Sequence, residues 1–149
     1  MIETTFFTDN DLAPHAETEV ARILRAAGLN IICHADRFPP GTEDQVWLGE
    51  CGRNGWIALS RDRQIRYTPL AKERIMSAGV RLFLLIGRHP HARLAQNFVN
   101  TLQQVHDCIR RNEEGFIARV YMAPEADFLR SRPGRVKEWL TRAEWLQGR

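Results

Sequence analysis

The sequence predicts an α/β protein, a three-layer α/β/α sandwich built on a mainly parallel sheet of five strands. Short apolar runs alternate along the chain with segments in which apolar residues recur at helical spacing. The run VRLFLLI at 80–86 is apolar on both faces, as a strand is when helices cover both sides of a parallel sheet. Strands and helices that alternate in this way form parallel sheets through right-handed crossovers.

The five expected strands lie at 4–8, 29–34, 56–60, 80–86 and 116–121. The fifth run, FIARVY, alternates between apolar and polar residues as an edge strand would. A first helix is expected to follow Pro14 and to end at Gly28. Thr42 with Gln45 matches a capping box that opens a second helix.

Two further helices complete the alternation. One is capped by Thr68, starts at Pro69 and ends at Gly79, and the longest spans 91–109 with its apolar residues along one stripe. Residues 1–122 are therefore expected to form the main domain. Residues 123–149 are expected to form a helical appendage, whose short helix contains Trp139, Leu140 and Trp145 and suits contact with a second copy or a small partner.

Length and composition are those of one ordinary globular domain: 149 residues, of which 44% are hydrophobic and 26% charged. The three cysteines are an odd number without metal-type spacing, which predicts reduced thiols in a cytoplasmic protein. The N-terminus lacks the features of a signal peptide, and no apolar stretch is long enough to span a membrane, so no membrane association is expected.

Charge is distributed unevenly along the chain. Residues 1–60 carry four Arg against nine Asp or Glu, a net charge of −5, whereas residues 61–149 carry seventeen Lys or Arg against nine acids, a net charge of +8. An acidic pocket beside a basic flank suits a metal site that acts on a polyanion, because Lys and Arg attract phosphates at long range. A basic surface that only keeps the protein soluble is the alternative.

Three aspartates are the main candidates for the chemistry. Asp9 follows the first strand, Asp62 follows the third strand by one residue, and Asp44 lies in the first turn of the helix between them. Because the carboxyl ends of parallel strands meet at one edge of a sheet, these acids are expected to converge there and to bind Mg²⁺ or Mn²⁺. For Asp44 the alternative is an acid that only complements the helix dipole.

The segments TDNDL, TEDQVWL and GWIALSRDRQIR, in this order, resemble the PIN-like domains. More narrowly, they are similar to the short PIN-like proteins that often act as the ribonuclease toxin of a bacterial toxin-antitoxin pair. The resemblance covers roughly residues 4–121. It implies a Mg²⁺- or Mn²⁺-dependent endoribonuclease with RNA as substrate and a small antitoxin protein as partner. Asp9, Asp44 and Asp62 match the metal-ligand positions, and Ser60 with Arg61 matches the small hydroxyl and basic residue before the third acid.

Several nearby residues keep two interpretations. Asp11 is either a further metal ligand or the cap of the first helix. The arginines that follow the third strand either clamp phosphates or lie in a solvated turn. These are Arg61, Arg63 and Arg66. Asp36 lies after the second strand, on the same expected edge. Asp107 lies close to the far end of its helix, which argues against it as a fourth ligand.

Other functions would also use residues at this edge of the sheet. FFTDNDLA also resembles the nucleophile loop of haloacid dehalogenase-type phosphatases, in which Asp9 would be phosphorylated and Asp11 would act as general acid. Against it, Ala13 stands where that family has Thr or Val, and the late acidic pair is missing. A receiver domain would use Asp62 as phosphoacceptor but needs a Lys after the fifth strand. A PIN-like module that binds without catalysis is the non-enzymatic alternative.

Overall fold

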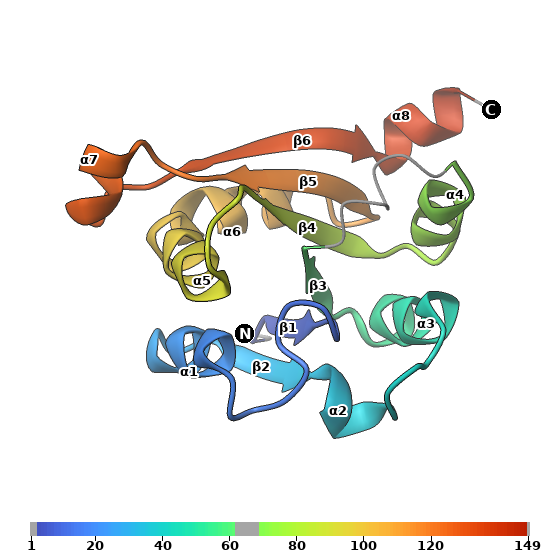
Figure 1. The fold of residues 1–149 in the computed structure, drawn as a ribbon. Helices are drawn as coiled ribbons and strands as arrows, with labels where there is room; N and C mark the ends of the chain where they lie inside the picture. The colour runs from blue at the N-terminus through green and yellow to red at the C-terminus, as the bar shows by residue number, and fades with distance from the viewer. Residues whose placement is uncertain (1–2, 62–68, 149) are drawn as a thin grey trace.

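The centre of the protein is a twisted sheet with strand order β2-β1-β3-β4-β5-β6 (Figure 1). The computed structural model describes residues 3–61 and 69–148, and within these ranges the sheet has six strands. Five strands pair in parallel, and β6 pairs antiparallel with β5. The strands are β1 (Thr5–Thr8), β2 (Asn30–Cys33), β3 (Ile57–Ser60), β4 (Arg81–Ile86), β5 (Phe116–Tyr121) and β6 (Arg135–Thr141).

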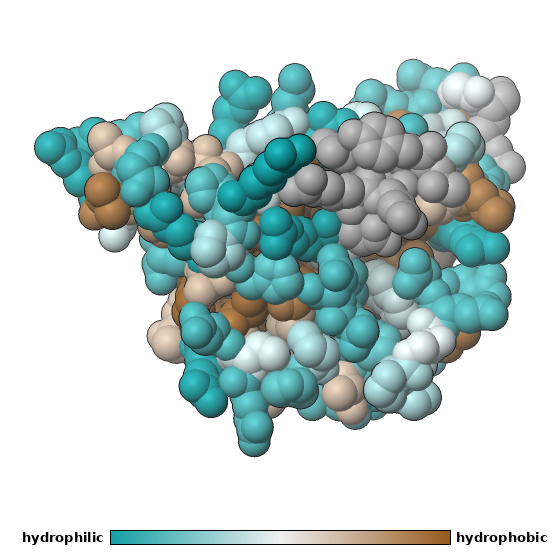
Figure 2. Space-filling view, viewed as in Figure 1, coloured by the Kyte–Doolittle hydropathy of each residue, from teal (hydrophilic) through white to brown (hydrophobic). Residues whose placement is uncertain are grey.

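Helices cover both faces of the sheet, which confirms the predicted three-layer α/β/α sandwich. The helices are α1 (Glu19–Ala26), α2 (His34–Arg37), α3 (Asp44–Asn54), α4 (Pro69–Ser77), α5 (His91–Asn100), α6 (Leu102–Arg111), α7 (Glu125–Leu129) and α8 (Arg142–Gln147). Residues of α1, α5 and α6 pack into the core on one face, and residues of α3 and α4 pack into the core on the other. In the space-filling view, hydrophilic residues cover most of the visible surface (Figure 2).

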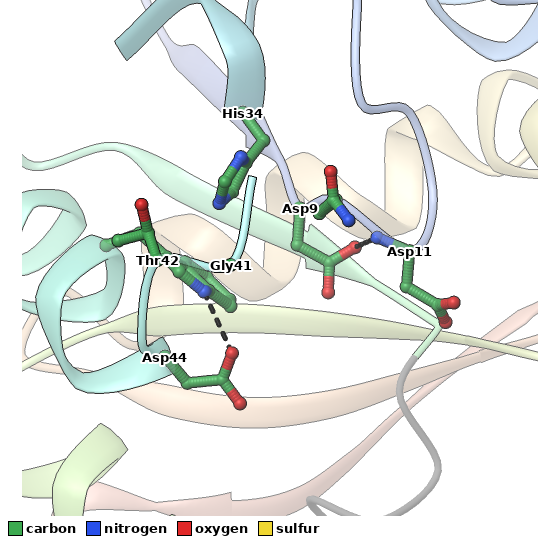
Figure 3. Close-up of a pocket in the computed structure, with 8 residues that line it drawn as sticks. Asp9, Asp11, His34, Gly41, Thr42 and Asp44 are labelled. Atoms are coloured by element: carbon green, nitrogen blue, oxygen red, sulfur yellow. Dashed lines mark hydrogen bonds between the residues drawn. The ribbon is translucent and has the colours of Figure 1, made fainter. Parts of the chain in front are cut away.

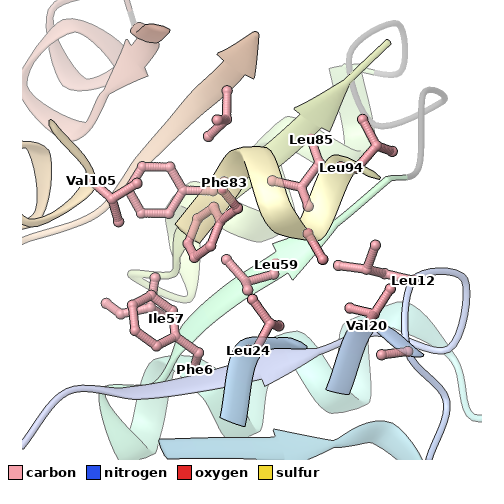
Figure 4. Close-up of a cluster of buried hydrophobic side chains, with 14 of the residues drawn as sticks. Phe6, Leu12, Val20, Leu24, Ile57, Leu59, Phe83, Leu85, Leu94 and Val105 are labelled. Atoms are coloured by element: carbon pink, nitrogen blue, oxygen red, sulfur yellow. The ribbon is translucent and has the colours of Figure 1, made fainter. Parts of the chain in front are cut away.

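The first core joins α1, α5 and α6 to the sheet through large apolar side chains (Figure 4). The Phe6 and Phe98 rings meet edge to face with their centroids 5.7 Å apart, and the Phe83 ring lies 6.1 Å from Phe98 and 5.0 Å from Phe116. All four rings are fully buried. Because burying one such side chain stabilises the fold by roughly 1.5–3 kcal/mol, this cluster holds the end of β1 firmly in place.

The second core is centred on the Phe7 ring. Trp47 stacks on it at 5.5 Å and Trp56 at 5.9 Å, while Phe38 meets it edge to face at 5.9 Å. Phe7 and Trp47 are buried. Since Phe6 and Phe7 are neighbours on a strand, their side chains point to opposite faces, and β1 is fixed from both sides.

Helix boundaries in the first part of the chain differ from the prediction. Helix α1 begins at Glu19, later than expected after Pro14, because Thr18 is its N-cap and accepts a hydrogen bond from the Ala21 amide at 3.2 Å. Helix α3 begins at Asp44 with Glu43 as N-cap. The predicted capping box is wrong, because the Thr42 hydroxyl donates to the Pro39 carbonyl instead.

The expected long helix over 91–109 is two helices, α5 and α6, which meet at Thr101. The Thr101 hydroxyl donates to the Asn97 carbonyl at 2.6 Å and accepts from the Gly134 amide at 3.0 Å. Ser and Thr hydroxyls that bond back to the preceding turn bend helices. Thr101 thereby interrupts the helix and also contacts the segment that leads into β6.

The last part of the chain differs most from the prediction. Trp139 and Leu140 lie in the strand β6, not in a short helix, and only Trp145 is helical, in α8. The strand β5 is therefore an interior strand and not the edge strand that its alternation suggested. Trp139 and Leu140 pack against the second core, which explains why a polar, Arg-bearing segment becomes a strand.

Two further expectations concern cysteines and membranes. The three cysteines are buried free thiols, as predicted. Burial raises the pKa of Cys51 to about 12 and that of Cys108 to about 11, so these thiols are protonated and unreactive at neutral pH. Within residues 3–61 and 69–148, no helix is both long and apolar enough to cross a bilayer.

Candidate functional site

A cavity of about 470 Å³ opens at the carboxyl edge of the sheet, between the loop after β1 and the start of α3. Its lining residues are Asp9, Asn10, Asp11, His34, Gly41, Thr42, Asp44 and Trp47. Three of these are acids, and none of the described lining residues is Lys or Arg. Two of the three predicted metal-binding aspartates, Asp9 and Asp44, are thus brought together in one negatively charged pocket (Figure 3).

Asp9 is the most constrained acid in this pocket. Its residue is only 5% exposed, and its backbone amide donates to the Leu59 carbonyl. Its Oδ1 accepts hydrogen bonds from the amides of Asp11 at 3.1 Å and Leu12 at 3.0 Å, and its Oδ2 accepts one from the Ser60 hydroxyl at 2.5 Å. These donors come from the β1 loop and from the end of β3, so both elements fix the orientation of the carboxylate.

Asp44 reaches the same pocket from the first residue of α3. Its Oδ1 accepts a hydrogen bond from Trp47 Nε1 at 3.0 Å, and Trp47 in turn stacks on Phe7. Trp47, Leu48 and Cys51 are buried, as predicted for the face of the helix that carries Asp44. The tryptophan therefore holds the Asp44 carboxylate at the pocket mouth, a constraint that an acid serving only the helix dipole would not need.

The other acids that the sequence singled out lie in different surroundings. Asp11 is exposed at the pocket rim, and its carboxylate points away from that of Asp44 (Figure 3). It does not cap α1, because Thr18 does. Asp36 accepts a hydrogen bond from the Cys33 amide at 2.8 Å and so closes the first turn of α2. Asp107 pairs with Arg110 on α6.

His34 lines the pocket and was not among the predicted site residues. It follows β2 directly, is 2% exposed, and its ring packs 6.2 Å from the Phe7 ring and 5.6 Å from the Phe38 ring. Burial lowers the pKa of His34, and the Asp44 carboxylate opposes that shift. Its position after β2 was the available signal, since residues that follow parallel strands share one edge of the sheet.

Of the predicted substrate-binding residues, the structure describes two. The buried Ser60 hydroxyl is bonded to Asp9, and the Arg61 guanidinium donates to the Gly87 carbonyl at 3.2 Å, beyond the end of β4. Arg61 therefore connects the ends of β3 and β4. Asp62, Arg63 and Arg66 lie outside the described residues, and their roles stay predictions.

The chemistry of the pocket fits a hard divalent cation. Its acids, Asp9, Asp44 and Asp11, offer carboxylate oxygens, which Mg²⁺ and Mn²⁺ prefer as ligands. Within the described ranges no group of three His, Cys, Asp or Glu side chains comes together as a complete metal site. The third predicted acid, Asp62, follows Ser60 by two residues in the sequence.

Comparison with protein families agrees with this geometry. The model of the family described as PIN like domain matches residues 4–87, which contain β1 to β4 and every residue that lines the acidic pocket. Comparisons with curated proteins and with solved structures gave no match. The matched region covers more than half of the chain and ends before β5, whereas the resemblance in the sequence was expected to reach residue 121. The chain therefore belongs to the PIN-like domain family.

Proposed function

We propose that this protein is a metal-dependent endoribonuclease and that it acts as the toxin of a toxin-antitoxin pair. The observation that carries the proposal is the convergence of Asp9 and Asp44 in one pocket at the carboxyl edge of the sheet. Membership of a family whose fold suggests nucleases supports the same reaction class. Neighbouring carboxylates repel one another, so a site of this kind favours a bound cation.

Asp9, Asp44 and Asp62 would hold Mg²⁺ or Mn²⁺, with Asp11 at the rim as a further candidate ligand. A bound divalent cation would lower the pKa of a bound water and neutralise charge on the phosphodiester. The chain's own residues orient the reactants. Two backbone amides and Ser60 fix the Asp9 carboxylate, and Trp47 fixes that of Asp44. Arg61, Arg63 and Arg66 would bind the phosphates of the RNA strand.

The proposal is tested by cleavage of a labelled RNA with Mg²⁺ or Mn²⁺ and with a chelator. Asp9→Asn preserves the shape of the side chain, and its Oδ1 still accepts the two backbone hydrogen bonds, so it is expected to abolish cleavage while the protein remains folded. Asp62→Asn is expected to do the same. Undiminished cleavage by either variant would contradict the proposal. Hydrolysis of small phosphomonoesters through a phosphorylated Asp9 would favour the phosphatase alternative instead.

Thermal unfolding tests metal binding without reference to activity. Mg²⁺ at about 100 times its Kd should stabilise the wild type by roughly 2.7 kcal/mol, because it binds only the folded state. Asp44→Asn keeps an acceptor for Trp47 and removes one negative charge, so we expect it to melt higher than wild type without metal and to gain far less from Mg²⁺. Equal responses to Mg²⁺ would show that Asp44 is not a ligand.

The antitoxin part of the proposal has a separate test. A small protein encoded beside this chain should bind it and suppress RNA cleavage, and expression of the chain alone should arrest growth in a manner that Asp9→Asn relieves. Growth arrest that persists in Asp9→Asn would contradict a toxin acting through RNA cleavage. RNA binding without cleavage would favour the PIN-like binding module.

A further inference from the structure

Basic residues gather on one part of the sheet that the acidic pocket does not include. Strand pairing aligns Leu84 of β4 with Arg119 of β5 and Lys137 of β6. Two residues further along, on the same face, Ile86 is aligned with Tyr121 and Arg135.

Directly paired residues project to the same face of a sheet. Because Leu84 belongs to the second core, the paired cations lie on the face that α3 and α4 cover, which is the face from which Asp44 enters the pocket. They also lie toward the carboxyl ends of β4 and β5. The pocket is found at this same edge of the sheet.

The cations on this face have no acidic partners among the described residues. Arg135 and Lys137 are exposed, and Arg119 is half-buried with its Nε lacking a described hydrogen-bond partner. The acids of the neighbouring segments pair elsewhere. Asp127 binds Arg132 at 3.2 Å, and Glu138, on the opposite face of β6, binds Arg111 at 2.8 Å.

Aromatic rings lie among these cations. The Arg135 guanidinium lies 5.9 Å from the Tyr121 ring centroid, and both Arg119 at 4.7 Å and Lys72 of α4 at 4.4 Å lie over the Trp139 ring. Arg119 also donates to the Tyr121 hydroxyl at 3.1 Å. A positively charged surface with interspersed aromatic rings is how single-stranded nucleic acids are bound without sequence preference.

The path from the pocket to this surface crosses neighbouring strands. From β1 to β6 there are four strand spacings, which amount to roughly 19 Å at about 4.8 Å each. Arg61, bonded to Gly87, and the exposed Arg88 lie on the way, beyond the end of β4. Because the carboxylates of the pocket repel phosphates, affinity for a polyanion has to come from cations outside the pocket.

From these observations we propose that single-stranded RNA held at the acidic pocket continues over a basic strip formed by Arg119, Tyr121, Arg135, Lys137 and Trp139. The strip supplies sequence-independent affinity, and the pocket supplies the reaction. This inference rests on the proposed ribonuclease function and adds to it the class of substrate, a single strand long enough to reach β6.

The test measures binding of a short fluorescent single-stranded RNA in chelator, with all variants built on Asp9→Asn so that cleavage does not intervene. Arg135→Gln/Lys137→Gln is compared with the matched control Arg22→Gln/Arg110→Gln, which removes the same charge from exposed positions on α1 and α6. The strip variant should bind at least about tenfold more weakly. Its slope of log K against log salt should fall by about 1.4, because each phosphate contact on a single strand contributes about 0.7.

Three outcomes would overturn the strip: binding equal to that of the parent protein, an equal loss in the control, or no binding of RNA by the parent. A loss of binding to polyglutamate as large as that to RNA would also overturn it in favour of an acidic protein partner. Its failure is distinguishable from that of the ribonuclease proposal. If the strip substitutions are made in protein that keeps Asp9 and RNA cleavage survives, only the strip proposal is contradicted. If RNA binds at the strip but is not cleaved, only the ribonuclease proposal is contradicted.

Discussion

Asp9, His34 and Asp44 come from three separate segments and line the pocket at the carboxyl edge of the sheet. Asp9 is oriented by amides of its own loop and by Ser60 of β3, and Asp44 is oriented by Trp47. His34 differs from both, because its ring is buried beside Phe7 and Phe38. A buried imidazole facing an acidic pocket makes the stability of the protein depend on pH.

Burial lowers the pKa of His34 in the folded state, although Asp44 opposes this shift. As pH falls, the unfolded chain takes up the proton first, so the contribution to stability is fully present above the ordinary pKa of His, near 6.5. It is lost as pH falls through the lowered pKa of the folded state. We expect His34→Gln, measured by urea unfolding in chelator between about pH 8 and 5, to lose less stability on acidification than wild type. An identical pH dependence in the two proteins would contradict this.

At the scale of elements, polar side chains of α5 and α6 bind the end of β5, the segment that follows it and the start of β6. Asn97 donates to the Tyr121 carbonyl and accepts from the Ala123 amide, and Gln104 accepts from the Val136 amide. Between these contacts the chain passes very close to β5 at Gly134. A Cβ there would lie 2.0 Å from the Tyr121 carbonyl oxygen and 2.8 Å from Asn97 Oδ1.

Gly134→Ala should therefore destabilise the protein by about 1–3 kcal/mol, the usual cost of forcing an extra methyl group into a packed region. The matched control is Gly148→Ala, since the nearest atoms to a Cβ at that position are 3.7 Å away. Urea unfolding followed by tryptophan fluorescence measures both. Equal stability of Gly134→Ala and wild type would show that the β5–β6 connection can move away at no cost.

At the scale of the whole molecule, the uneven charge along the chain corresponds to a separation of acidic and basic residues in space. The acids of the first part meet in the pocket, and basic residues of the last part face solvent on β5 and β6. Strand β6 also covers the backbone edge of β5, which would otherwise be free to pair with another chain. The division of the chain at residue 122 stays a prediction, and a truncation tests it.

A chain that ends at residue 134 lacks β6 and α8, and we expect it to aggregate or to lose cooperative unfolding, because the edge of β5 and the second core are exposed. A chain that ends at residue 141 keeps the whole sheet and loses only α8. It should stay folded without aggregating, with reduced stability from the lost contact between Arg142 and the Met76 carbonyl. Size-exclusion chromatography and thermal unfolding compare the two. A chain ending at 134 that folds cooperatively and does not aggregate would instead support an independent domain over 1–122.

The alternation of apolar runs determined the central part of the fold. A strand such as β4, apolar on both faces, can only be buried between helices, so its type follows from its residues alone. The boundaries were harder to predict. The Thr42 and Thr101 hydroxyls donate to the Pro39 and Asn97 carbonyls, three and four residues earlier in the chain. The spacing of apolar residues does not reveal such bonds, so the capping box and the undivided long helix were wrong.

The order of elements also determined which end of the sheet carries the acidic pocket, because Asp9 directly follows a parallel strand and Asp44 opens a helix at the same edge. The tertiary structure decided what the sequence could not express. The packing of the His34 ring against Phe7 and the pairing of residues 135–141 with β5 both involve partners far away in the chain. The local sequence pattern indicates the secondary-structure propensity of a segment. Burial and strand pairing depend instead on backbone and side chains that are distant in the sequence.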